Sequence, residues 1–260
     1  MQKWLYRLLI ELTNHRFSSL ILKKFSQSRA SAILIPAYAK IYSIDQVEME
    51  KKLTEFKTLH ELFVRKIKKE HRVIDKNESS VISPVDAVVE ETGIVMSSKE
   101  IIVKNKRYSI AEMLGDEESL SKYIGGIFLI LYLSPSHYHR IHSPISGEIT
   151  KQWELGSKSY PVNRLGLKYG REPLSKNFRK VTEIHTDGGH LAMVKVGAMF
   201  VNSIETTHTS KYITKGEEIA YFSFGSTVIL LFEKDCFTLK STIKTSYDVR
   251  VGEVIGYKME

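Results

Sequence analysis

The sequence is poor in cysteine and has no long apolar run. Its single cysteine, Cys236, excludes an intramolecular disulfide and fits a reducing compartment. The longest nearly apolar run, residues 124–133, has ten residues. It is too short to cross a bilayer, so it predicts a buried strand. The apolar stretch at the start carries Arg7 and Glu11, and we therefore expect no secretory signal.

The chain also has no basic stripe interleaved with aromatic residues and no nucleic-acid-binding motif. Its formal net charge is nevertheless +8. A charge of this sign favours an anionic partner. Without the features of a nucleic-acid reader, the charge indicates an acidic membrane surface rather than DNA or RNA.

Residues 1–70 are predicted to form a helical, membrane-associating region. Leu5, Leu8, Leu9 and Leu12 recur at helical spacing, and a second short amphipathic segment follows at 17–25. Residues 1–45 hold seven Lys or Arg against two acidic residues. A basic amphipathic helix can lie in a membrane interface, although packing against its own domain is the alternative. A further helix is expected from Thr58, where residues 58–61 form a capping box.

Residues 71–260 are predicted to form a β-rich catalytic domain. Two motifs recur there: Ser-Pro at 83–84 and 143–144, and Gly-Glu at 216–217 and 252–253. Such repeats suggest duplicated hairpins. The fold class expected is α+β, with a mainly antiparallel β-barrel or sandwich core preceded by amphipathic helices. The polar stretch 153–179 is expected to be a long loop covering a site. The predicted strands are 88–96, 127–133, 191–196, 218–224, 228–232 and 250–257.

Three small residues, Gly225, Ser226 and Thr227, interrupt the apolar and aromatic run 221–232. Glycine allows a kink or close backbone approach. Ser226 would then place its hydroxyl beside a peptide carbonyl with little steric cover. This arrangement is what attack by a serine on its own preceding peptide bond requires, although the same triplet also occurs in ordinary bulges.

Three histidines, His137, His139 and His142, stand within six residues between two Ser-Pro pairs. In an extended segment His137 and His139 would point the same way and could bind zinc. No convincing further ligands emerge, so we expect no metal. The alternative is that one histidine acts as a general base and another as a proton donor.

Asp86 enters a predicted strand and could orient an imidazole or cap a turn. Asp86, His142 and Ser226 together have the residue types of a catalytic relay. In such a relay the acid fixes the tautomer of the base, and the base activates the hydroxyl. These residues would equally suit a serine hydrolase, which would keep a single uncleaved chain.

Residues from about 50 to 232 resemble the phosphatidylserine decarboxylases. The Gly-Ser-Thr triplet together with the Tyr-His-Arg-Ile-His run is specific for that family. Ala87, Val73 and Asn202 depart from its usual pattern without removing a chemical group. The resemblance rests on the segments 62–75, 84–86, 138–144, 196–204 and 222–228.

The resemblance implies a self-processing enzyme that decarboxylates phosphatidylserine to phosphatidylethanolamine and CO₂. Asp86 and His142 would activate Ser226 to cleave the bond after Gly225, and Ser226 would become a pyruvoyl cofactor. This group would form a Schiff base with the lipid amine, and His139 would serve decarboxylation and protonation. The chains 1–225 and 226–260 would stay associated. We expect peripheral attachment to the cytoplasmic face of the cell membrane, and the sequence leaves the oligomeric state open, a homodimer included.

Overall fold

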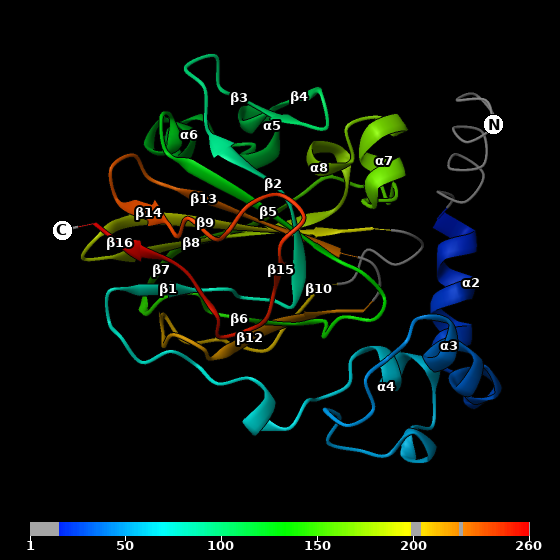
Figure 1. Ribbon diagram of the computed structural model, residues 1–260. Helices are drawn as coiled ribbons and strands as arrows, with labels where there is room; N and C mark the ends of the chain where they lie inside the picture. The colour runs from blue at the N-terminus through cyan, green and yellow to red at the C-terminus, as the bar shows by residue number, and fades with distance from the viewer. Residues whose placement is uncertain (1–15, 199–203, 224–225, 260) are drawn as a thin grey trace.

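The computed structural model describes residues 16–198, 204–223 and 226–259 (Figure 1). Four predicted features fall at least partly outside this range: the leucine stripe of residues 5–12, Asn202, the strand 218–224 and Gly225. No helix within these residues is long and apolar enough to cross a membrane. The described chain contains short helices at its start and two layers of antiparallel sheet after them.

The first described segment folds around its own small core. It comprises α2 (Arg16–Gln27), the 3₁₀ helix η1 (Arg29–Leu34), α3 (Ile35–Ile41), η2 (Leu53–Glu55), α4 (Leu59–Phe63) and η3 (Lys69–His71). Helix α4 begins where the capping box predicts, because the Thr58 hydroxyl accepts a hydrogen bond from the Glu61 amide at 3.1 Å. The Leu59 amide, in turn, donates to the buried Ser31 hydroxyl at 2.9 Å, tying α4 to η1. A cluster of apolar side chains, including Ile35, Phe56 and Leu62, closes this core.

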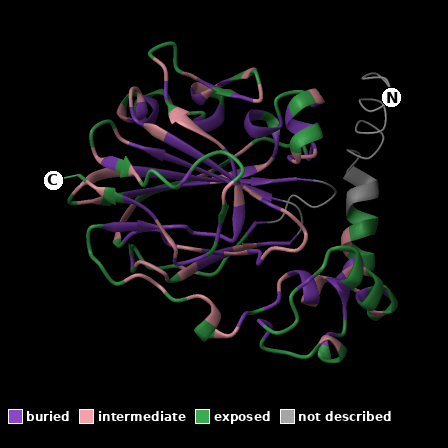
Figure 2. Cartoon of the chain, viewed as in Figure 1, coloured by how far each residue is buried: buried purple, intermediate pink, exposed green. Residues whose placement is uncertain are grey.

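An eight-stranded antiparallel sheet forms the centre of the molecule, in the order β11-β7-β8-β9-β13-β5-β2-β15. Strand β13 lies between β9 and β5, and all seven of its residues are buried (Figure 2). A strand covered on both faces reads as a continuous apolar run, which explains residues 226–232. The bounds are β2 (Ala87–Ile94), β5 (Ile127–Leu133), β7 (Gly147–Leu155), β8 (Arg179–Thr186), β9 (Gly189–Gly197), β11 (Tyr212–Ile213), β13 (Ser226–Phe232) and β15 (Asp248–Val249).

Two three-stranded sheets cover one face of the large sheet. One has the order β10-β12-β6 and the other β1-β16-β14. The main hydrophobic core fills the space between the layers, with Leu131 and Leu230 from the large sheet and Phe222 and Ile255 from the small ones. The α+β fold with an antiparallel sandwich core is therefore confirmed. The bounds are β1 (Ser80–Ile82), β6 (Arg140–His142), β10 (Ile204–Thr206), β12 (Glu218–Phe222), β14 (Phe237–Leu239) and β16 (Val254–Lys258).

The opposite face of the large sheet is covered by a hairpin and four short helices, seen at the top of Figure 1. Two of these helices lie in the stretch 153–179, which was expected to be a loop. That expectation was wrong for α7 and α8. The stretch as a whole is polar, but Leu167 and Leu174 are buried against the sheet and hold the two helices there. The elements are β3 (Glu100–Val103), β4 (Lys106–Ser109), α5 (Ile110–Leu114), α6 (Glu117–Tyr123), α7 (Arg164–Tyr169) and α8 (Pro173–Lys176).

The sequence repeats form matching pairs of turns. The Ser143 amide donates to Glu217 O, and the Gly216 amide donates to Ser143 O, both at 2.8 Å. In the other half, the Ser83 amide donates to Glu253 O at 2.8 Å and the Gly252 amide to Ser83 O at 3.2 Å. Both glycines have positive φ, 82° and 90°, which explains why glycine stands there. The predicted duplicated hairpins are therefore present, and they place Asp86 and Ser146 at equivalent positions.

Candidate active site

Ser226 begins β13 and lies wholly inside the protein. Its backbone pairs with Leu133 of β5 and Gly197 of β9, and its exposed fraction is 0%. The hydroxyl has no hydrogen-bond partner among the described residues, and the same holds for the neighbouring Thr227. Buried polar groups are normally hydrogen-bonded, so an unpaired hydroxyl at this point suggests a chemical role. Gly225, the other half of the predicted cleavage site, lies outside the described residues.

His139 is also completely buried, and neither ring nitrogen has a partner in the described structure. Its ring stacks on Phe63 of α4, with 3.8 Å between centroids. Burial, with smaller contributions from Arg65 and His137, holds the imidazole pKa well below its usual value. The lowered pKa favours the neutral ring at physiological pH.

The strand pairing brings Ser226 and His139 to the same end of the two sheets. Ser226 pairs with Leu133, and the Phe222 amide donates to His139 O at 2.9 Å. Two connections thus join the layers: three residues between Phe222 and Ser226, and five between Leu133 and His139. Each end of one connection is paired with an end of the other: Ser226 with Leu133, and Phe222 with His139. The side chains of Ser226 and His139 therefore start from neighbouring parts of the backbone.

His142 lies further along β6, where it pairs with Glu218, and its ring is engaged on both sides. Its Nδ1–H donates to Gly216 O at 2.8 Å, which leaves a lone pair on Nε2. The Tyr138 hydroxyl lies 3.3 Å from Nε2 and can donate to it. Burial lowers the pKa of His142, although the Gly216 carbonyl opposes this shift. This neutral tautomer is the one that a base acting through Nε2 requires. The group that orients the ring, however, is a backbone carbonyl and not a carboxylate.

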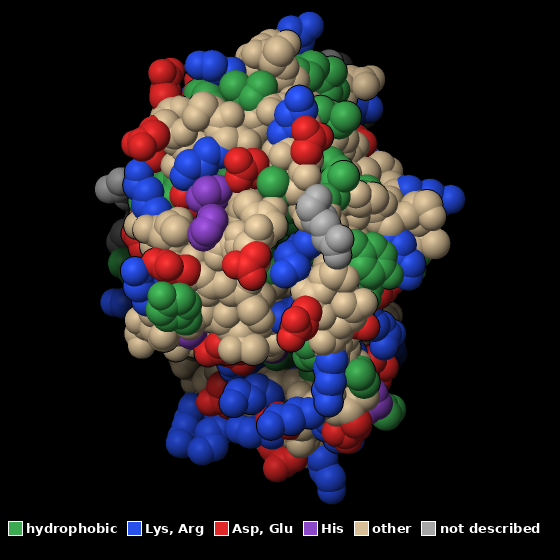
Figure 3. All heavy atoms as spheres, turned by 90° about the vertical axis from the view of Figure 1, so that its left-hand side faces the viewer, with side chains coloured by type: hydrophobic (Ala, Val, Ile, Leu, Met, Phe, Trp, Pro, Cys, Tyr) green, Lys and Arg blue, Asp and Glu red, His purple; other side chains and the backbone are tan. Residues whose placement is uncertain are grey.

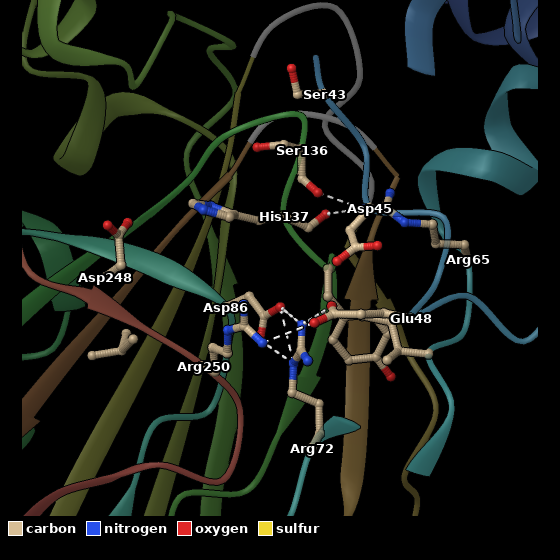
Figure 4. Close-up of a pocket in the computed structure, with 13 residues that line it drawn as sticks. Ser43, Asp45, Glu48, Arg65, Arg72, Asp86, Ser136, His137, Asp248 and Arg250 are labelled. Carbon is tan, nitrogen blue, oxygen red and sulfur yellow. Dashed lines mark hydrogen bonds and ion pairs between the residues drawn. The ribbon is translucent and has the colours of Figure 1, made fainter. Parts of the chain in front are cut away.

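Asp86 makes no hydrogen bond to His142. Its Oδ1 accepts from the Val251 amide at 2.9 Å, as the Ser146 hydroxyl accepts from the Lys215 amide in the other half. Its carboxylate is further held by Arg72, whose Nε donates to Oδ1 at 2.8 Å and whose Nη2 contacts Oδ2 (Figure 4). The carboxylate thus caps a turn and binds an arginine.

The expected relay of Asp86, His142 and Ser226 is consequently not assembled in this structure. The physical reason is that other groups already bind two of the three members: Arg72 binds the acid, and Gly216 and Tyr138 bind the imidazole. The roles assigned to the three residues stay predictions, and their use in a relay requires these hydrogen bonds to exchange.

A cavity of about 310 Å³ lies beside this site and is lined by charges of both signs (Figure 4). Asp86 and Arg72 form part of its wall, and Glu48 joins them by a 2.7 Å ion pair with Arg72. Arg65, just after α4, borders the cavity and donates to Ser136 O at 2.5 Å, so it fixes the connection that carries the histidines. The charged lining comprises Asp45, Glu48, Arg65, Arg72, Asp86, Asp248 and Arg250.

His137 lines the same cavity rather than joining His139. Its Nδ1 accepts from the Ser134 amide at 3.0 Å, and burial lowers its pKa. His139 is instead sealed against Phe63, so the two rings do not form a common ligand pair. Among the described residues, no group of three or more His, Cys, Asp or Glu could hold a metal ion. The zinc alternative therefore has no ligand set in this part of the chain.

Three partners of the site were missed by sequence reasoning: Arg72, Tyr138 and the Gly216 carbonyl. Arg72 and Tyr138 stand inside segments that carry the family resemblance, but nothing local indicates which carboxylate or imidazole they bind. A backbone carbonyl has no sequence signature. Only the repeated Gly-Glu turns could have indicated that Gly216 faces the Ser-Pro segment.

Comparison with known proteins identifies the family. The family model described as phosphatidylserine decarboxylase matches residues 59–257. A relative from Geobacillus sp. (strain WCH70), named phosphatidylserine decarboxylase proenzyme, is 63% identical over 257 residues, covering 99% of both chains. A relative of the same name from Anoxybacillus flavithermus is 62% identical and covers 99% of this chain and 97% of its own. The chain therefore belongs to the phosphatidylserine decarboxylase family.

Proposed function

We propose that this chain is a self-processing enzyme that converts phosphatidylserine into phosphatidylethanolamine and CO₂. The proposal is supported by the family model and by the names of relatives that match the chain over its full length. The observation that carries it is the buried Ser226 hydroxyl, which has no partner among the described residues. The strand paired with Ser226 leads to His139, whose ring nitrogens also have none there.

In maturation, the Ser226 hydroxyl attacks the Gly225 carbonyl and converts the peptide bond into an ester. Elimination then breaks the ester, leaving a Gly225 carboxylate and a dehydroalanine at position 226. One water converts the latter into a pyruvoyl group and one ammonia. The word proenzyme in the relatives' names is consistent with such processing. The products are chains 1–225 and 226–260, and the central position of β13 between β9 and β5 supports their staying associated.

The surroundings of residue 226 fit such a group. Among the described residues, the buried side chains of Ser226, Thr227 and His139 hold polar atoms without a hydrogen-bond partner. A pyruvoyl group supplies an electrophilic carbonyl that serves as electron sink for the loss of CO₂. His139 would relay a proton to the carbon that loses CO₂; because burial keeps its ring neutral, it must first take up from water the proton that it delivers.

For the cleavage step His142 is the proposed base, and Asp86 would orient it after the carboxylate has exchanged Arg72 for the imidazole. The Nδ1–H tautomer fixed by Gly216 supports a base acting through Nε2. The Tyr138 hydroxyl must leave Nε2 before the imidazole takes a proton from Ser226. Asp86→Asn should slow cleavage if the acid takes part, and Arg72 would then control how readily the acid is released.

The proposed location is the cytoplasmic face of the membrane. Helices α2 and α3 and η1 expose a set of large apolar side chains, among them Ile33 at 81% and Ile41 at 73%. Figure 3 shows Lys and Arg side chains gathered at the lower end of the molecule, where Figure 1 places the segment before β1. Apolar and basic groups on neighbouring surfaces suit an anionic bilayer. The apolar set is Leu20, Ile21, Leu22, Phe25, Ile33, Leu34, Ile41 and Tyr42.

Mass spectrometry of the denatured protein tests the maturation step. Wild-type protein should yield a C-terminal fragment of about 4 kDa out of 29.8 kDa, lighter by one ammonia than simple hydrolysis would give. Ser226→Ala should remain a single chain. Thr227→Val is the matched control, because it removes the adjacent buried hydroxyl on the other face of β13 and should still be cleaved. A single uncleaved chain in protein that releases CO₂ from phosphatidylserine would refute the maturation proposal.

A further inference from the structure

Lys195 is a buried cation that the proposed reaction does not use. It lies two residues before the end of β9, and only 3% of it is exposed. Its Nζ donates to the Thr182 hydroxyl of β8 at 2.5 Å. No carboxylate in the described residues pairs with it, so one of its three N–H donors is used and its charge is not balanced.

A cavity of about 230 Å³ lies against this amine, at an edge of the space between the layers. Thr182 and Lys180 line it from β8, Gln152 from β7, and Thr206 from the end of β10 in the second layer. Glu154 also lines the cavity, and its Oε1 lies 2.8 Å from the Nζ of Lys180. Several hydrogen-bond donors therefore converge on a small space that has a positive wall.

The lysine shares its sheet face with Ser226. Strand β13 pairs Ser226 with Gly197 and Val228 with Lys195. Val228 belongs to the core between the layers, whereas Val194 and Val196, on either side of Lys195, belong to the opposite face. Lys195 is thus on the strand next to Ser226 and two residues further along. Ideal strand spacings give about 8 Å between the two Cα atoms. Its amine leans away from Ser226, towards β8.

Burial of an unpaired ammonium is costly, and a bound anion removes that cost. Burial, with a smaller effect from Lys180, lowers the pKa of Lys195 to about 7. A tetrahedral oxyanion has enough acceptor atoms to meet Lys195, Thr182 and Lys180 together, with Lys180 using one N–H for Glu154 and another for the anion.

We propose that the pocket formed by Lys195, Thr182, Lys180, Gln152 and Thr206 binds a phosphate-type oxyanion. Free phosphate and the phosphodiester of a glycerophospholipid headgroup share this chemistry. The headgroup source rests on the proposed function, because a lipid amine reacting at residue 226 would bring its own phosphate to this face of the sheet. Binding of free phosphate does not depend on that function.

The test is calorimetric titration of full-length protein with inorganic phosphate, against chloride at equal ionic strength. Wild-type protein should bind phosphate, and Lys195→Met should weaken binding at least about tenfold, the loss expected for a charge-assisted hydrogen bond. Lys211→Met is the matched control, since Lys211 is 67% exposed, pairs with Glu148 and lies outside the pocket. Phosphate should also raise the melting temperature of wild-type protein and of the control, but not of Lys195→Met.

Kinetics with a short-chain, soluble phosphatidylserine separate the two sources. If phosphate competes with this substrate and Lys195→Met raises KM with little change in kcat, the pocket receives the headgroup. If phosphate binds through Lys195, but neither phosphate nor Lys195→Met changes the KM for phosphatidylserine, the site takes free phosphate. Absence of phosphate binding by wild-type protein, or equal binding by Lys195→Met, overturns the proposal. Phosphate binding by a protein without decarboxylase activity would retain the site and refute the proposed function.

Discussion

Replacement of Arg72 by methionine tests the importance of the charge cluster beside the candidate active site. The arginine side chain is only 9% exposed and bridges two carboxylates, Asp86 at 7% and Glu48 at 11%. Arg72→Met would leave both acids in a poorly solvated site. Removing one partner of a buried ion pair costs about 3–5 kcal/mol. Because the Val251 amide still binds Asp86, we expect the lower end, about 3 kcal/mol.

Arg250→Met is the matched control, because Arg250 binds the same Glu48 at 2.9 Å but is 64% exposed. An exposed pair contributes less than about 1 kcal/mol. Urea unfolding should be measured in the uncleaved Ser226→Ala background, so that one chain unfolds. The urea concentration at the unfolding midpoint should be lower for Arg72→Met. The slope of the unfolding free energy against urea concentration should be unchanged. Equal losses for the two arginine variants would refute the reasoning.

The pH dependence of this loss has a definite sign. Burial tends to raise the pKa of Glu48, but the hydrogen bond and charge of Arg72, followed by the charge of Arg250, outweigh it and lower the pKa. A depressed carboxylate pKa stabilises the folded state above the unfolded value, near 4.5, and this stabilisation is lost as pH falls through the folded value. The gap between wild-type protein and Arg72→Met should therefore be widest at neutral pH and narrow in acid. In protein that retains Ser226, the rate of self-cleavage of Arg72→Met reports whether the ion pairs of Arg72 with Asp86 and Glu48 matter for maturation.

Three further predictions concern other parts of the molecule. His142→Ala should block self-cleavage, whereas His139→Ala should cleave and lose decarboxylation; denaturing gels and CO₂ release distinguish them, and the opposite pattern would reverse the two roles. The unfolding free energy of wild-type protein should rise relative to Lys195→Met between about pH 7 and 10.5, because the unfolded chain keeps a proton that folded Lys195 releases; the slope is at most about 1.4 kcal/mol per pH unit, and a constant difference would contradict it. Deletion of residues 1–45 should lower activity on anionic liposomes far more than on soluble phosphatidylserine, and equal losses on both would return these helices to a packing role.

Local patterns predicted much of the fold because they depend on neighbouring residues. The predicted strand 127–133 agrees with β5, and Thr58 caps α4 as its capping box predicts. The repeated Ser-Pro and Gly-Glu turns likewise indicated paired halves, since a turn needs particular residues at fixed positions. The stretch 153–179 was misread because only the sheet beneath it makes Leu167 and Leu174 part of a core.

The sequence by itself determined the family, the antiparallel sandwich and the residue types of the site, because motifs, alternation and turn residues are properties of adjacent positions. Only the tertiary structure decided which groups meet. It placed Asp86 with Arg72 rather than His142, and it paired the imidazole of His142 with the Gly216 carbonyl. Within the described part of the chain, it left the side chains of Ser226 and His139 unpaired at one end of the sheets. Competition among many possible donors and acceptors settles such contacts, and distant segments take part in it only after the chain has folded.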